Sequence, residues 1–226
     1  MDFRLMGIAS QAFHQKKGGL QATFEHMCYD FVYPDIYHVL RFLENHDTDR
    51  FLPALPESVE DLYAFKQGMT FLLTIPGIPQ LYYGQELLMN GNKAKGDGYV
   101  RLDVPGGWPG DTRDEFTAEG RSAVQNEAWN FLRTILHWRK GNDVIARGQM
   151  KHFMPDNGVY VYERRLDERA AIIIMNGQDE PVDLPLDRYA ELLQGKTSGK
   201  DILPGRTIPL QKELSLSSKE ILILEI

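Results

Sequence analysis

Two β-prone runs of the sequence end in polar residues that are suited to chemistry. The largely apolar run Tyr37–Leu43 stops at Glu44–Asp47, a stretch with two carboxylates, an amide and an imidazole. The run Ile78–Tyr83 stops at Gly84–Glu86, which brings a third carboxylate. Buried parallel strands end in this way at a polar face, and the sites of parallel α/β folds lie at the C-terminal face of the sheet. We therefore expect these carboxylates to share one face.

A helix is expected between these two runs. Ser58 with Asp61 three residues later predicts a capping box, and Pro76–Gly77 ends the helix. Its apolar residues repeat at i, i+3 and i+4 spacing: Val59, Leu62, Phe65, Met69 and Leu72. The order strand, helix, strand predicts parallel strands, because parallel neighbours need a crossover connection of this kind.

Two further helices and a long loop complete the first part of the chain. We expect one helix over Gly7–Lys17, and a strongly amphipathic helix that ends in a C-cap at Gly141–Asn142. The apolar face of the second helix consists of Val124, Ala128, Phe131, Leu132, Ile135 and Leu136. The Gly-rich, charged stretch Asn90–Glu119 is too long for a simple connection, which indicates a functional loop.

Short β-rich runs follow from about Gln149 onward. Turn signals at Pro155–Gly158 and Asn176–Gly177 separate them at the spacing of an antiparallel sandwich. The runs are Val159–Tyr162, Ala171–Met175, Tyr189–Leu193 and Ile221–Leu224. The expected fold class is α/β followed by all-β, with one domain over residues 1–145 and a second over residues 146–226.

Composition excludes several classes of protein. The chain has 25 Lys and Arg against 32 Asp and Glu, a formal net charge of −7. Nucleic-acid binding and polybasic attachment to membranes both need positive charge, so neither is expected. No apolar run has the length of a membrane helix. The single cysteine, Cys28, excludes an intrachain disulfide, and the histidines show no zinc-type spacing, so no metal site is expected in this segment.

Three segments resemble the α-amylase family, glycoside hydrolase family 13. Phe42–Phe51 (FLENHDTDRF) looks like the family's fourth conserved region. Ile75–Glu86 (IPGIPQLYYGQE) is similar to its Gly-x-Pro-x-x-Tyr-Tyr-Gly-x-Glu motif on the eighth barrel strand, and Met1–Leu5 resembles the Asp-Phe-x-Leu after the sixth strand. The long loop, with Gly96–Arg101 and Pro105–Gly110, is similar to that of neopullulanase and cyclomaltodextrinase-like enzymes of starch utilisation.

The resemblance implies a (β/α)8 barrel, of which the chain holds only the C-terminal part. A complete barrel needs about 250 residues, whereas the α/β part ends near position 145. The family's nucleophilic Asp on strand four and general-acid Glu on strand five belong to motifs that this sequence lacks. We therefore expect the missing N-terminal barrel portion to be a partner of this chain, and the chain by itself to self-associate through its uncovered strands.

Asp47 is implied to be the family's third carboxylate, which binds the C2 and C3 hydroxyls of the sugar in the −1 subsite. It would help to distort the sugar toward the oxocarbenium-like transition state, and contacts that tighten there raise the rate. His46 would donate to the same hydroxyls. From the residues alone, Asp47 is also explained as a strand-end cap or turn residue, and His46 as a hydrogen-bonded core histidine.

Four residues are expected to support the site without reacting: Asn45, Arg50, Tyr83 and Glu86. Arg50 is expected to pair with Asp49 or Glu44, and Glu86 to order the loop after the eighth strand by accepting backbone N–H bonds.

Arg101 and Trp108 are the other candidates for substrate binding. Arg101, with Asp97 and Lys93, lies where family members place minus-subsite sugar contacts, although a charged loop is also explained as a solvated one. Trp108 is expected to stack on a glucose face or to pack the loop onto the barrel.

The function implied is retaining hydrolysis of α-1,4 linkages in maltooligosaccharides, cyclodextrins or pullulan, with an α-glucan oligosaccharide as the partner. A non-catalytic carbohydrate-binding module and a transglycosidase or isomerase of the same family remain as alternatives. No cofactor is expected in this segment, and calcium remains an alternative for the full enzyme. The N-terminus has no secretory signal, so the compartment is open, with a periplasmic or secreted full-length enzyme as one alternative.

Overall fold

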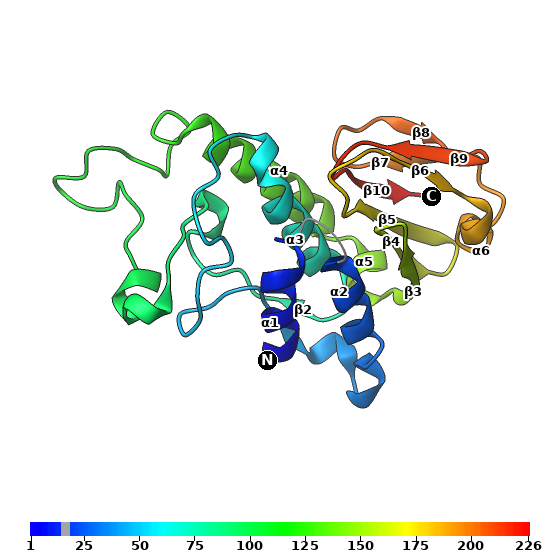
Figure 1. The fold of residues 1–226 in the computed structure, drawn as a ribbon, viewed down its shortest axis with the longest axis horizontal. Helices are drawn as coiled ribbons and strands as arrows, with labels where there is room; N and C mark the ends of the chain where they lie inside the picture. The colour runs from blue at the N-terminus through cyan, green and yellow to red at the C-terminus, as the bar shows by residue number, and fades with distance from the viewer. Residues whose placement is uncertain (15–18) are drawn as a thin grey trace.

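The computed structural model of the chain describes residues 1–14 and 19–226. Helices occupy its centre, antiparallel sheets lie on one side, and long loops extend on the other (Figure 1). The central part consists of α1 (Phe3–Ala12), α2 (Gly19–Met27), β1 (Leu40–Arg41), α3 (Tyr63–Thr74), β2 (Ile78–Pro79), α4 (Ala123–Arg139) and α5 (Asp143–Arg147). The sheet part consists of β3 (Gln149–Asp156), β4 (Val159–Leu166), β5 (Arg169–Asn176), β6 (Val182–Pro185), α6 (Ala190–Leu193), β7 (Ser198–Asp201), β8 (Thr207–Pro209), β9 (Glu213–Leu216) and β10 (Ile221–Glu225).

The first helix begins earlier than predicted. Asp2 is its N-cap: the carboxylate accepts a hydrogen bond from the N–H of Leu5 at 2.9 Å, so α1 starts at Phe3 rather than at Gly7. The predicted end at Lys17 lies outside the described residues. Asp2 also ties the helix to the sheet, because its own N–H donates to the carbonyl of Leu40 at 2.9 Å.

The two predicted strands are parallel, as expected, but much shorter than expected. Leu40 pairs with Ile78 and Arg41 with Pro79. The start of the first predicted run is wrong: Ile36–His38 forms a 3₁₀ helix, because the Asp35 carboxylate caps it. A proline in the second strand has no N–H to donate, so the ladder has few hydrogen bonds.

The connecting helix α3 begins four residues after the predicted position. The Asp61 carboxylate accepts from the N–H and the hydroxyl of Ser58 at 3.1 and 2.9 Å, which is one half of the expected capping box. A 3₁₀ turn over Glu60–Leu62 follows, and the regular helix starts at Tyr63. Gly77 ends this segment with φ of 119°, and a Cβ there would lie 2.7 Å from the carbonyl oxygen of Val39. Only glycine allows this approach to the residue before β1.

The long helix α4 agrees with the prediction. Ser122 and Gln125 form a full capping box at its start. Gly141 follows the C-cap residue Lys140 with φ of 81°, the left-handed conformation that commonly stops a helix.

The sandwich contains a six-stranded sheet in the order β3-β4-β5-β10-β7-β8 and a two-stranded sheet of β6 and β9. All pairs in both sheets are antiparallel, which confirms the all-β prediction for this part. The strand predicted over Tyr189–Leu193 is wrong, because these residues form a 3₁₀ turn and α6. Leu186, Tyr189 and Leu193 are spaced for one helical face, and all three are buried.

The six-stranded sheet is covered on both faces. Val161, Ile172 and Leu224 face the two-stranded sheet in one apolar core. On the other face, Tyr162 and Ile173 belong to a core shared with the central helices. The boundary at residues 145/146 lies between α5 and β3 and stays a prediction. No helix in residues 1–14 or 19–226 has the length and hydropathy to cross a membrane.

Asp2 gives a test of this fold. Burial acts to raise the pKa of Asp2, but hydrogen bonds from His26 and from the N–H of Leu5, with the charges of His26 and Arg41, hold that pKa below its ordinary value. A lowered folded-state pKa contributes stability above the unfolded-state pKa of about 4, and this stability is lost as the pH falls through the folded-state pKa.

We therefore expect Asp2→Asn to lower the free energy of unfolding at pH 7, and the difference from wild type to shrink below about pH 4. Urea unfolding at pH 7, 5 and 3 measures this difference, with Asp103→Asn in an exposed loop as the control. A difference that is the same at pH 7 and pH 3 would contradict the role given to the Asp2 charge.

Candidate active site

Asp47 lies just beyond the C-terminal end of β1, in a turn that Asn45 builds. The side-chain oxygen of the buried Asn45 accepts the N–H of Asp47 at 2.8 Å. The N–H of Asn45 in turn donates to the hydroxyl of Thr48 at 3.0 Å. These bonds fix the direction in which the Asp47 carboxylate leaves the backbone, while its side chain stays 53% exposed. The turn thus presents a carboxylate to solvent in one orientation.

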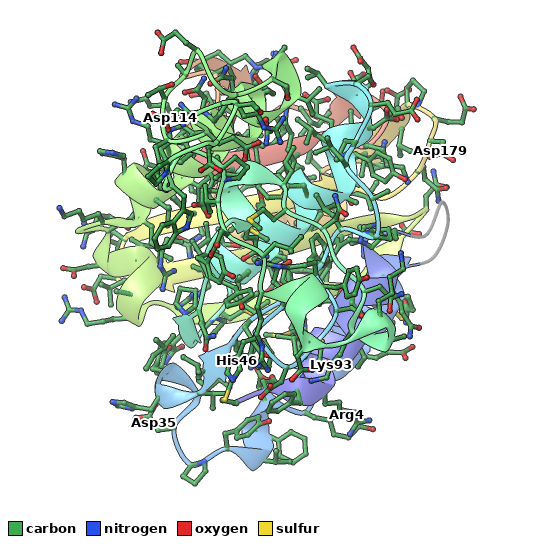
Figure 2. All side chains as sticks on the ribbon, turned by 90° about the vertical axis from the view of Figure 1, so that its left-hand side faces the viewer. Arg4, Asp35, His46, Lys93, Asp114 and Asp179 are labelled. Carbon is green, nitrogen blue, oxygen red and sulfur yellow. The ribbon has the colours of Figure 1, made fainter. Side chains whose placement is uncertain are left out.

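Three cationic or protonatable groups surround that carboxylate. His46 Nε2 lies 3.1 Å from Asp47 Oδ2. Arg101 Nη2 lies 3.1 Å from Oδ1, and Lys93 Nζ lies 3.8 Å from the same oxygen. Figure 2 shows His46 and Lys93 at the same end of the molecule, close to each other in the view. The structure therefore brings together the predicted residues Asp47, His46 and Arg101.

The segment that carries the two cations is tied to the turn. Arg101 Nε donates to the carbonyl of His46 at 2.9 Å, and its Nη2 donates to Asp97 at 2.9 Å. Lys93 Nζ lies 3.3 Å from Asp97, and the N–H of Lys93 donates to Asp49 at 2.6 Å. Asp97 thus holds both cations in place. Part of the charged loop is therefore ordered against the site rather than merely solvated.

A buried ion pair supports the turn from below. Arg50 Nη1 donates to Glu44 Oε1 at 2.8 Å, and both side chains are almost fully buried. The other oxygen of Glu44 accepts the N–H of Phe51 at 2.6 Å. Burial raises the pKa of the Glu44 carboxyl, against the opposing effects of the Phe51 N–H and Arg50. Of the two partners expected for Arg50, the structure selects Glu44 and leaves Asp49 to Lys93.

Arg50 also connects the ends of the two strands. Its Nη1 donates to the carbonyl of Tyr83 at 2.7 Å, and its guanidinium lies 4.1 Å from the ring centre of Tyr82. The Tyr83 hydroxyl donates to the carbonyl of Leu102 at 2.9 Å, so the residues after β2 reach the loop as well. Sequence reasoning missed Tyr82, although the Tyr-Tyr pair of the motif was the available signal. The cation–π contact adds to the hydrogen bond that holds Arg50 between the two strand ends.

Glu86 is the carboxylate at the end of the run that follows β2. Burial raises the pKa of its carboxyl, while the N–H groups of Glu86 and Gly84 and the charge of Arg50 act in the opposite direction. These backbone contacts agree in kind with the expected ordering role, which stays a prediction.

Trp108 is not joined to the turn. The residue is 65% exposed, and its backbone N–H donates to the Asp111 carboxylate within its own loop at 3.0 Å. Figure 2 shows Asp114, of the same loop, at the opposite end of the view from His46. A stacking role for Trp108 stays a prediction. In the part of the chain that the structure describes, no three His, Cys, Asp or Glu side chains gather as a metal site.

Comparison with known proteins shows which family the chain belongs to. The family model for the catalytic domain of α-amylase matches residues 2–163. The chain belongs to the α-amylase family. A second model, for the cyclo-malto-dextrinase C-terminal domain, matches residues 150–225. The first match covers the turn, the buried ion pair and the loop, and the second covers nearly all of the sandwich.

Individual relatives span far more sequence than this chain. It is 27% identical over 213 residues to a cyclomaltodextrin glucanotransferase of Thermoanaerobacterium thermosulfurigenes, covering 89% of the chain and 26% of the relative. It is 26% identical over 216 residues to an α-amylase of Niallia circulans, covering 91% of the chain and 36% of the relative. The chain thus spans about a quarter to a third of these curated relatives.

Solved structures show the same fold. The α-amylase of Geobacillus thermoleovorans, crystallised with acarbose, superposes with a TM-score of 0.76 at 22% identity, over 100% of this chain and 47% of that one. Structural neighbours of this family contain (β/α)8 barrels, so the central part and the sandwich correspond to the C-terminal part of a barrel enzyme and the domain after it.

The Glu44–Arg50 pair gives a test of the site's support. Removing one partner of a buried pair leaves the other charge without compensation, which costs about 3–5 kcal/mol. We expect Glu44→Gln to lower the free energy of unfolding by about 3 kcal/mol, measured by urea unfolding.

Glu127→Gln is the matched control, because Glu127 pairs with Lys66 at the surface. Exposed pairs contribute about 0–1 kcal/mol, so this variant should change little. Equal losses for the two variants would show that the buried pair does not support the site.

Proposed function

We propose that this chain supplies the C-terminal part of a retaining α-glucan hydrolase, in which Asp47 stabilises the transition state. The observation that carries the proposal is the Asp47 carboxylate, held in one direction by Asn45 and flanked by His46 and Arg101. A carboxylate can accept hydrogen bonds from two neighbouring hydroxyls at once, which suits the C2 and C3 hydroxyls of a sugar ring. The family to which the chain belongs suggests the substrate class, an α-1,4-linked oligosaccharide such as a maltooligosaccharide, a cyclodextrin or pullulan.

Each neighbour of Asp47 has a role in this proposal. His46 donates to the same hydroxyls as the ring flattens toward the oxocarbenium-like transition state. Arg101 holds the Asp47 carboxylate in place and, with Asp97, contacts the next sugar of the oligosaccharide substrate. Because the Asn45 turn fixes the carboxylate before the sugar arrives, little reorganisation is needed during the reaction, which is the condition for electrostatic stabilisation.

The nucleophile and the general acid would come from a preceding barrel portion. The two-residue strands β1 and β2 support this, because eight strands normally close such a barrel and only this parallel pair occurs in the described residues. The chain also spans only part of its relatives. We propose that this barrel portion is the main partner of the chain, and calcium in the full enzyme stays a prediction.

A transglycosidase is the second candidate. Several relatives are named cyclomaltodextrin glucanotransferases, and the motifs seen here do not distinguish transfer to water from transfer to a sugar. Product analysis with maltoheptaose separates the two: a hydrolase gives shorter linear sugars, and a transferase gives cyclic or longer ones.

A carbohydrate-binding module is the weaker alternative. The sandwich has no tryptophan, and its candidate platform residues Tyr160, Tyr162 and Tyr189 are all buried. A sugar-binding platform needs exposed aromatic faces, so these rings support packing instead.

Asp47→Asn in the full-length enzyme tests the central role. The amide is the same size but loses the charge that the transition state requires, so we expect kcat to fall by about 10²–10³ while KM changes much less. Asp103→Asn, in the exposed loop, should leave both constants unchanged. An unchanged kcat with only a higher KM would show that Asp47 merely binds the ground state.

The 226-residue chain alone should not hydrolyse maltoheptaose or pullulan, because Asp47 cannot attack or protonate the glycosidic bond in the proposed mechanism. Purified chain, assayed for reducing ends, measures this directly. Turnover that Asp47→Asn abolishes would refute the proposal that the nucleophile and the general acid come from a preceding barrel portion. Size-exclusion chromatography of the same sample tests whether the open edges of the two-stranded sheet β1-β2 lead to self-association.

A further inference from the structure

The sandwich holds a buried cation that has no carboxylate partner in the described residues. Arg164 on β4 is fully buried, and its guanidinium donates to backbone carbonyls. Nη1 donates to Thr74 at 2.7 Å, while Nε and Nη2 donate to Gly148 at 3.1 and 2.7 Å. Burial lowers the pKa of Arg164 to about 10, so the group remains charged at neutral pH. A buried charge is costly, so its carbonyl partners must be held in place around it.

One acceptor of Arg164, Thr74, belongs to the segment that leads into β2, and the other, Gly148 between α5 and β3, is bonded to the segment that leads into β1. Thr74 is the last residue of α3, four positions before β2. The carbonyl of Gly148 also accepts the hydroxyl of Tyr37 at 3.0 Å, and Tyr37 lies three positions before β1. One side chain of the sandwich therefore meets the starts of both strands, directly at one and through a shared carbonyl at the other.

Few backbone hydrogen bonds join these two strands to each other. Two backbone hydrogen bonds join them, from Ile78 to Val39 at 2.9 Å and from Gln80 to Arg41 at 2.8 Å. At their other ends the strands carry the active-site turn and the Tyr83 carbonyl that binds Arg50. A shift of either strand start therefore moves Asp47 relative to the residues after β2.

We propose that Arg164 is a positioning residue for the glycosidase reaction, acting from the sandwich on Asp47 through Thr74 and Tyr37. The inference rests on the proposed function for its catalytic consequence, but not for the anchoring itself. Geometry of reacting groups is sensitive at the level of about 1 Å, so loss of the anchor slows the chemical step. Substrate binding is affected less, because the loop that carries Arg101 and Lys93 is tied to the turn independently.

The chain offers a matched control on the same strand. Arg165 is the next residue of β4, and its guanidinium bonds stay within the sandwich, to Leu192, Glu163 and Gln194. Arg165→Met therefore removes a cation from the same strand without touching either strand start. Tyr37→Phe is the milder second variant, since it removes one hydroxyl from the carbonyl of Gly148 and leaves Arg164 intact.

Amide hydrogen exchange of the 226-residue chain tests the anchoring. We expect Arg164→Met to accelerate exchange at Ile78 and Gln80 at least tenfold, with exchange at Ile173 in the sandwich unchanged. Tyr37→Phe should give a smaller acceleration at the same two amides, and Arg165→Met none. If Arg164→Met does not fold, Tyr37→Phe decides the question. The proposal would be overturned if both amides exchanged in the variant at the wild-type rate, or if exchange were accelerated equally throughout the sandwich.

Kinetics of the full-length enzyme test the catalytic consequence. We expect Arg164→Met to lower kcat at least tenfold with KM within twofold, and Arg165→Met to leave both unchanged. Unchanged kcat in Arg164→Met, while Asp47→Asn is strongly impaired, would overturn the positioning role alone. Full activity of Asp47→Asn would instead refute the proposed function, and the exchange data would still decide whether Arg164 anchors the strands.

Discussion

The apolar packing on both faces of the six-stranded sheet is the constraint on which the rest of the structure depends. Val161 and Ile172 turn toward the two-stranded sheet, and Tyr162 and Ile173 turn toward the helices. Along a strand, residues alternate between faces, so a strand that is apolar at every position must be covered twice. The central helices provide the second cover, and this fixes α3 against the sheet.

From α3 the chain passes directly into β2, and the charged groups of the site then follow from local rules. Glu44 and Arg50 neutralise each other in the interior, where removing either partner would leave the other charge uncompensated. Asn45 then needs only one turn to bring Asp47 into solvent. The exposed ion pairs around Asp47 are weak individually. Asp97 links Lys93 and Arg101 into one network, which holds the loop against the turn.

Sequence patterns predicted the elements that depend on local interactions. The long helix α4 has both its capping box and its C-terminal glycine in the expected places, and the β-rich runs of the sandwich formed strands with one exception. That exception, Tyr189–Leu193, is apolar at helical as well as β spacing, and the burial of Leu186, Tyr189 and Leu193 on one helical face distinguishes the two. The strands β1 and β2 were predicted too long, because a strand extends only as far as its partner does.

The site, too, was predicted only where short local motifs define it. Asp47 and His46 are adjacent in one short motif, and the resemblance to the family placed Arg101 in a loop near them. Tyr82 was missed although its motif was visible, whereas the carbonyl contacts of Arg164 were not predictable, because they join segments far apart in the sequence through geometry that no pattern encodes.

The double coverage of the six-stranded sheet also limits how this fold can be recombined. Sandwich domains are often treated as modules that can be exchanged between enzymes at a linker. Here the face of β4 that meets the helices carries Tyr162 and Arg164, which bond to Thr74 at the end of α3. A chimera that keeps the helices but takes its sandwich from another protein must therefore also retain that face of β4, and a graft at the linker alone would leave the helices against a surface that does not fit them.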